Sequence, residues 1–217
     1  MRRHARLTFK FVVMIFIRCN QVVLLGEGRV GKTSLLLRYV KDSFSDSQAP
    51  TVQATYLSKT VKLENDARVT LNVWDTAGQE RFHALGPIYY RDADAAVLVY
   101  DITDADSFAR VKTWVKELRQ IAGGEISLAV CANKSDLERS RSVSTSDGEA
   151  YAKSIGASFF SASAKAGKGV EQVFASVAKA LDAKRGASTS GAKGVGRSRS
   201  LKIAREEETK PKSGDCC

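Results

Sequence analysis

The stretch Gly26-Glu27-Gly28-Arg29-Val30-Gly31-Lys32-Thr33 decides how the rest of the chain is interpreted. It fits the pattern G-x-x-x-x-G-K-[ST], in which glycines let backbone N–H groups surround phosphate oxygens. Lys32 is expected to reach the β- and γ-phosphates, and the Thr33 hydroxyl is expected to bind Mg²⁺. The competing interpretation is an ordinary glycine-rich turn between a strand and a helix.

The flanking residues place this motif where a phosphate-binding loop belongs. Residues 22–25 are valines and leucines that run into a glycine, which is typical of a buried strand. Leu35, Leu36, Tyr39 and Val40 follow at helical spacing. A helix that starts near Lys32 would direct its N-terminal dipole at a bound phosphate.

The rest of the middle of the chain alternates strand and helix patterns. Strands are expected over 55–63, 68–74, 95–100, 126–132 and 159–160, and helices over 108–118, 150–155 and 170–181. The runs 95–100 and 126–132 are continuously apolar, as expected for strands covered on both faces. The alternation predicts an α/β fold with helices on both faces of the sheet.

Two further motifs follow at strand ends. Asp75 ends an expected strand and Gly78 comes three residues later, so the carboxylate can reach Mg²⁺ while the glycine N–H meets the γ-phosphate. The run Asn133-Lys134-Ser135-Asp136 directly follows the strand over 126–132. Sheets of this class bind ligands at the carboxyl ends of their strands.

The second of these motifs predicts a preference for guanine. A carboxylate at Asp136 can accept hydrogen bonds from guanine N1–H and the 2-amino group. Adenine lacks that pair of donors and would leave the carboxylate unsatisfied. Ser163-Ala164-Lys165, after the last strand, offers a backbone N–H for the guanine O6.

On these residues the chain resembles a Ras-superfamily small GTPase, and within it a Rab, from about Val22 to Leu181. The stretch WDTAGQERF at 74–82 is similar to the second switch of Rab proteins. The stretch FHALGPIYYRD at 82–92 resembles the endosomal branch, nearest to the Rab twenty-one subgroup with Rab five as neighbour. The resemblance implies a G domain whose six-stranded, mostly parallel sheet has one antiparallel edge strand.

The resemblance also implies the roles of single residues. It makes Gln79 the catalytic residue that orients the attacking water, and makes Thr51 close the first switch on Mg²⁺ and the γ-phosphate. Phe44 would pack beside the guanine. The implied nucleotide-binding residues are Gly26, Glu27, Gly28, Arg29, Val30, Gly31, Lys32, Thr33, Ser34, Phe44, Thr51, Asp75, Gly78, Asn133, Lys134, Asp136, Ser163, Ala164 and Lys165, the metal ligands are Thr33, Thr51 and Asp75, and the effector-binding residues are Tyr56, Trp74 and Tyr89.

These roles describe a molecular switch that binds GTP or GDP with Mg²⁺. Hydrolysis is expected to be slow until a partner supplies an arginine, because no residue of the chain resembles such an arginine. The expected partners are an exchange factor, a GTPase-activating protein, effectors, a GDP-dissociation inhibitor and a prenylation escort protein, acting on a monomer. An alternative is a Rab-like module that holds GTP without hydrolysing it, suggested by Arg29 where a small residue is common. An ATP-using P-loop enzyme is a third reading, which Asp136 argues against.

The net charge of +10 lies at the two ends of the chain. Residues 1–18 carry five Lys or Arg and no acid, and residues 184–217 carry nine Lys or Arg and four acids, so residues 19–183 are neutral in sum. A nucleic-acid-binding domain should carry its basic footprint on the fold itself, so we expect no nucleic-acid partner. Basic flexible ends fit an anionic membrane better.

The C-terminal segment, 184–217, is expected to be a flexible tail because it is rich in Gly, Ser, Lys and Arg without periodicity. It ends in Cys216-Cys217, and the resemblance implies that both are geranylgeranylated. Two lipid chains anchor a protein stably where one does so only marginally. The expected location is the cytosolic face of endosomal membranes, in exchange with the cytosol. The other cysteines, Cys19 and Cys131, show no zinc or disulfide spacing.

The N-terminal segment, 1–21, is an extension before the G domain at 22–183. Its apolar run Phe11 to Ile17 is seven residues, too short to span a membrane. Joining Leu7-Thr8-Phe9-Lys10 directly to Val22 gives the first strand usual in the family. Residues 11–21 are therefore interpreted as an insertion from a mis-predicted exon boundary. The alternative is a real extension that packs on the sheet edge or on a membrane.

Overall fold

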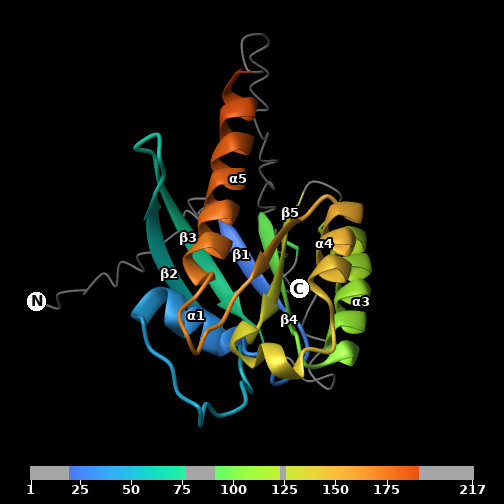
Figure 1. The fold of residues 1–217 in the computed structure, drawn as a ribbon. Helices are drawn as coiled ribbons and strands as arrows, with labels where there is room; N and C mark the ends of the chain where they lie inside the picture. Colours follow the sequence, from blue (N-terminus) through green and yellow to red (C-terminus); the bar gives the residue numbers. More distant parts are fainter. Residues whose placement is uncertain (1–19, 77–90, 123–125, 191–217) are drawn as a thin grey trace, which may run out of the picture.

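One six-stranded sheet forms the centre of the protein (Figure 1). The structure is a computed structural model that describes residues 20–76, 91–122 and 126–190. The strands are β1 (Gln21–Leu25), β2 (Thr55–Lys62), β3 (Arg68–Asp75), β4 (Ala95–Asp101), β5 (Ser127–Asn133) and β6 (Ser158–Ser161). They lie in the order β2-β3-β1-β4-β5-β6, and only the pair β2/β3 is antiparallel. The expected six-stranded sheet with one antiparallel edge strand is confirmed.

Helices cover both faces of this sheet (Figure 1). The α-helices are α1 (Lys32–Lys41), α3 (Ala105–Ile121), α4 (Thr145–Ser154) and α5 (Val170–Ser190), and η2 (Ser135–Ser140) is a 3₁₀-helix. Residues of α1 and α5 pack with Val22 and Leu24 of β1, whereas residues of α3 and α4 pack with Val23 and Leu25. Because successive side chains of a strand point to opposite faces, both sets must be apolar. This explains the continuous apolar runs of β1, β4 and β5.

The antiparallel edge is a hairpin of the two strands expected over 55–63 and 68–74, whose residues alternate between apolar and polar. Residues pair in register from Thr55 with Asp75 to Lys62 with Arg68. The turn is closed by a hydrogen bond from the Leu63 N–H to the Ala67 carbonyl at 2.8 Å, and Asp66 in the turn has φ 62°. This register carries Tyr56 of β2 directly opposite Trp74 of β3.

Helix α5 is longer than its sequence pattern indicates. Apolar spacing predicted the helix to 181 and a flexible tail from 184, but the helical backbone continues to Ser190. Its last turns project beyond the sheet (Figure 1), and nothing packs within 4 Å of the Cβ position at Gly186. Apolar periodicity reports only the part of a helix that packs, so it could not show this extension.

Strand β1 begins with Gln21, the last residue of the supposed insertion, and Asn20 directly precedes it. Gln21 pairs with Asn72 of β3, its N–H donates to Asp94 Oδ2 at 2.9 Å, and its side-chain Oε1 accepts the Trp74 indole N–H at 2.8 Å. The buried Asn20 donates from its side chain to the Thr70 carbonyl at 2.8 Å. Residues 1–19 lie outside the described part, so whether 11–21 belong to the natural protein stays a prediction.

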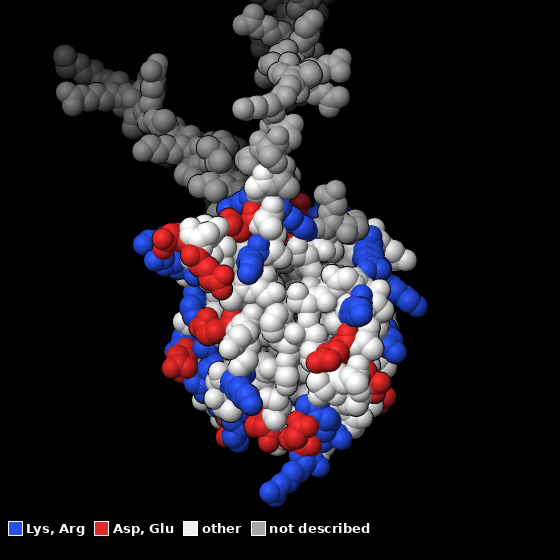
Figure 2. All heavy atoms as spheres, turned by 45° about the horizontal axis from the view of Figure 1, so that its top comes forward, with Lys and Arg blue, Asp and Glu red and all other residues white. Residues whose placement is uncertain are grey.

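Charged side chains of both signs are intermixed on the face seen in Figure 2, around a central uncharged area. This agrees with the neutral sum over residues 19–183. In the described ranges, none of the helices combines the length and the apolar character needed to cross a membrane.

A pair of glycines tests how tightly the loop before α5 is packed. A Cβ at Gly169, where φ is +74°, would lie 2.2 Å from the Ser161 carbonyl oxygen, whereas at Gly156, where φ is +68°, nothing lies within 4 Å. We expect Gly156→Ala to cost about 1–2 kcal/mol from left-handed strain alone. Gly169→Ala should cost about 3–5 kcal/mol because overpacking against backbone adds to that strain. Urea unfolding of both variants checks this, and equal losses would contradict the packing described.

Candidate functional site

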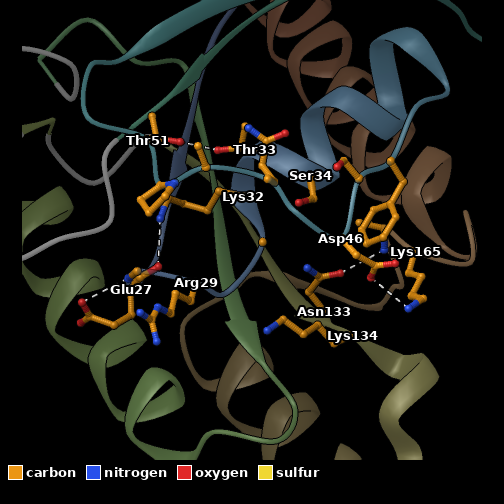
Figure 3. A pocket seen from close by; sticks show the side chains of 18 of the residues that line it. Glu27, Arg29, Lys32, Thr33, Ser34, Asp46, Thr51, Asn133, Lys134 and Lys165 are labelled. Atoms are coloured by element: carbon orange, nitrogen blue, oxygen red, sulfur yellow. Dashed lines mark hydrogen bonds and ion pairs between the residues drawn. The ribbon is translucent and has the colours of Figure 1, made fainter.

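A cleft of about 750 Å³ opens at the carboxyl ends of the strands. Its walls come from the loops that follow β1, β3, β5 and β6, together with the segment after α1 (Figure 3). The sequence-predicted residues that line it are Glu27, Gly28, Arg29, Gly31, Lys32, Thr33, Ser34, Phe44, Thr51, Asn133, Lys134, Asp136, Ala164 and Lys165. Motifs far apart in sequence thus meet in one place, where parallel sheets of this class bind ligands.

The phosphate-binding loop is shaped by close contacts to the Asn133 side chain. Asn133 Nδ2 donates to the Val30 carbonyl at 2.8 Å, and a Cβ at Gly31 would lie 2.6 Å from that same nitrogen. Gly31 also has φ 92°, which favours glycine. It is the N-cap of α1 and offers no side chain to the first-turn amides. Those amides are therefore available to an anion.

Lys32 lies buried beneath this loop. Its ammonium donates to the carbonyls of Gly26 at 2.8 Å and Glu27 at 3.0 Å (Figure 3). Burial lowers the pKa of Lys32 to about 8, although the nearby carboxylates of Asp75 and Glu27 act in the opposite direction. A phosphate in the cleft would raise this pKa again and favour the charged form further, because an adjacent anion raises the pKa of an amine.

Asp75, Thr33 and Thr51 meet at one end of the cleft. The Thr33 hydroxyl donates to Asp75 Oδ2 at 2.6 Å. Figure 3 shows its second contact, with the Thr51 hydroxyl 2.6 Å away. Asp75 is fully buried, and its Oδ1 has no hydrogen-bond partner among the described residues. Burial raises the pKa of Asp75, against the Thr33 hydrogen bond and the Lys32 charge. An orphaned carboxylate oxygen beside two hydroxyls is a donor set that suits Mg²⁺.

The other end of the cleft holds the Asn133–Asp136 motif. Asn133 Oδ1 accepts the Ala164 N–H at 3.2 Å, so one of the backbone groups of 163–165 that could meet guanine O6 has this partner. The Ser163 hydroxyl donates to Asp136 Oδ1 and thereby orients that exposed carboxylate. Lys134 Nζ lies 2.6 Å from Asp101 Oδ2. Burial alone would raise the pKa of Asp101, but hydrogen bonds from Lys134 and Thr103 outweigh it and lower the pKa.

The remaining predicted residues, together with Phe44, fall into four groups. Phe44 lines the cleft while its ring packs partly against the core. Tyr56 and Trp74 are in contact away from the cleft, with ring centroids 5.1 Å apart in an edge arrangement. Gly26, Val30, Asp75 and Ser163 support the cleft from behind its lining. Gly78, Gln79, Tyr89, Cys216 and Cys217 lie outside the described residues.

Three supporting residues were missed by sequence reasoning. Asp101 pairs with Lys134, Asp46 pairs with Lys165 at 2.9 Å, and the Thr76 hydroxyl donates to the Leu24 carbonyl at 2.7 Å. Asp101 ends β4 just as Asp75 ends β3, so its place at a strand end was a usable signal. Asp46 carries no such signal, because its partner lies 119 residues away.

Comparison with known proteins identifies the family to which this chain belongs. The model of the Ras family matches residues 21–183. Ras-related protein Rab-21 of Mus musculus is 49% identical over 203 residues, covering 91% of this chain and 90% of the relative. Rab-21 of Bos taurus is 56% identical over 161 residues, with 74% and 72% covered, and that of Dictyostelium discoideum is 53% identical over 154 residues, with 71% and 72% covered. The chain therefore belongs to the Ras family of GTPases, among the Rab proteins that resemble Rab-21.

Proposed function

We propose that this GTPase is a Rab-type switch of endosomal membranes that binds GTP or GDP with Mg²⁺ and hydrolyses GTP slowly. The observation that carries this proposal is the contact of Thr33, Thr51 and Asp75. It joins the phosphate-binding loop, the segment after α1 and the end of β3. A ligand that binds here therefore acts on all three segments at once.

Mg²⁺ would be held by Thr33, Thr51 and Asp75, where it would neutralise charge on the phosphate oxygens. Lys32 stabilises the same charge from beneath the loop, with the first amides of α1 beside it. Gln79 orients the attacking water. Without an arginine from a partner, hydrolysis is expected to proceed at roughly 10⁻⁴ s⁻¹, the order known for Ras.

Guanine is selected by Asp136, whose carboxylate accepts from two donors that adenine does not offer. The hydrogen bond from Ser163 supports this role because it limits rotation of the carboxylate. Lys134, held by Asp101, and Phe44 complete the base end of the cleft.

The switch is sensed through the first switch segment and the hairpin. When the γ-phosphate leaves, Thr51 would lose its contact with that phosphate and with Mg²⁺. The segment that leads to β2 is then released. Effectors would read the Tyr56 and Trp74 pair, with Tyr89, only while GTP is bound. Exchange factor, activating protein, GDP-dissociation inhibitor and escort protein would act on this cycle. Prenylated Cys216 and Cys217 would hold the chain on the cytosolic face of endosomes.

Removal of magnesium tests the metal site. For protein loaded with fluorescent GDP, excess EDTA should speed nucleotide release at least about tenfold, because a divalent cation contributes several kcal/mol to phosphate binding. Thr33→Ser keeps the hydroxyl and should keep this response. Thr33→Ala should release GDP rapidly with or without EDTA. An unchanged release rate for the unsubstituted protein in EDTA would contradict the assigned ligands.

Substitution at Asp136 tests base selection. Asp136→Ala should weaken GTP binding by about 10²-fold or more, since guanine loses a charged acceptor for two donors. Glu138→Ala removes an exposed carboxylate from the same 3₁₀-helix and should bind normally. Competition titration with GTP and ATP measures both variants. Displacement of GTP by ATP from the unsubstituted protein would overturn the guanine assignment.

Substitution at Gln79 tests the hydrolytic role. Gln79→Leu should slow single-turnover GTP hydrolysis by about tenfold or more, because the water loses the group that orients it. Gln172→Leu alters an exposed glutamine of α5 and serves as the control. Equal rates for Gln79→Leu and the unsubstituted protein would remove the role given to Gln79 and favour a module that holds GTP without hydrolysing it.

A further inference from the structure

We propose that Arg29 binds the phosphates of the nucleotide and slows its release. This inference rests on a guanine nucleotide occupying the cleft, as the proposed function requires. It goes further because it assigns the exposed cation of the phosphate-binding loop to nucleotide retention, rather than to solvent or to hydrolysis.

Arg29 lies at the rim of the cleft. Arg29 lines the cleft, and its side chain is exposed there. The next residue, Val30, is fixed through its carbonyl to Asn133 at 2.8 Å. In Figure 3 Arg29 lies on the rim with Glu27 and Lys134, across from Thr33 and Thr51. Arg29 therefore lies on the rim of the cleft away from Thr33 and Thr51.

The cations around the cleft differ in whether they already have partners. Lys134 is paired with Asp101 at 2.6 Å and Lys165 with Asp46 at 2.9 Å, while Lys32 donates to two carbonyls of the loop. Within the described ranges, no ion pair includes Arg29. A diphosphate or triphosphate that enters the cleft can therefore bind the Arg29 guanidinium without breaking an ion pair to a described carboxylate. The guanidinium fork also matches phosphate oxygens geometrically.

The backbone of Arg29 has an uncommon conformation. Its φ of 65° is left-handed, a conformation that long side chains adopt rarely. Such residues cluster at ligand-binding sites, where the surrounding structure enforces the conformation. Here the hydrogen bond from Asn133 to the next carbonyl supplies that enforcement. The loop therefore presents the Arg29 side chain from a fixed backbone.

The position of Arg29 distinguishes between two roles of an arginine near phosphates, acceleration of hydrolysis and retention of the nucleotide. An arginine that accelerates hydrolysis must reach the charge that develops around the γ-phosphate. That end is marked by Thr33, Thr51 and Asp75. On the opposite rim, Arg29 can add attraction to phosphates that both GDP and GTP carry, so its effect belongs to release of either nucleotide.

The test is the release rate of fluorescent GDP from the full chain in Mg²⁺, chased with unlabelled GDP at low and high salt. Arg29→Gln should release GDP about three- to tenfold faster at low salt, the range expected for one charge-assisted contact at an exposed position. The difference should shrink in high salt, since exposed charges are screened. Arg29→Lys should lie between the two. Lys153→Gln removes an exposed cation of α4 and should release GDP like the unsubstituted protein.

Two results would overturn the inference. One is equal release from Arg29→Gln, Lys153→Gln and the unsubstituted protein, all of which bind GDP. The other is a tenfold loss of single-turnover hydrolysis in Arg29→Gln with unchanged release, which would place the arginine at the γ-phosphate. Failure of the unsubstituted protein to bind GDP would instead overturn the proposed function, and the Arg29 inference with it.

Discussion

The buried carboxylate of Asp75 is the constraint on which the cleft depends. A carboxylate taken out of water must be matched by hydrogen bonds or by a cation. Thr33 satisfies Oδ2 and Lys32 lies near enough to act on its charge, whereas Oδ1 is left without a partner among the described residues. This arrangement is incomplete without a ligand, and Thr51 stands next to it. Binding chemistry and the position of the segment before β2 are therefore coupled through a single group.

Much of the fold could be predicted because its strands must be apolar on two faces. Val22 and Leu24 pack under one helix layer, and Val23 and Leu25 pack under the other, so the local run alone indicates a central strand. The hairpin could also be predicted, because apolar and polar residues alternate along its two strands and the turn at 64–66 fixes how they pair. The extension of α5 to Ser190 was not predictable in this way, because residues 182–186, the part whose side chains are described, are exposed or half-buried and leave no apolar pattern.

The cleft was predictable only where chemistry needs a particular residue at a strand end. The glycines of the loop after β1, Asp75 at the end of β3 and Asn133 at the end of β5 are residue types that the proposed ligand requires, and their order along the chain indicates one site. The ion pairs of Asp101 with Lys134 and of Asp46 with Lys165 support the same site but serve it indirectly. Such pairs depend on how loops approach in three dimensions, and any exposed Asp or Lys of the sequence is an equal candidate.

The proposed switch requires that the nucleotide state controls the contact between Thr51 and Thr33. Amide hydrogen exchange of residues 42–54, the segment between α1 and β2, measures this most directly, in protein loaded with Mg²⁺ and either GDP or a non-hydrolysable GTP analogue. We expect marked protection around Thr51 with the analogue and its loss with GDP, because the γ-phosphate and its Mg²⁺ would hold Thr51 in place and GDP offers no such group. Equal protection in the two states would contradict the claim that this chain is a switch operated through Thr51.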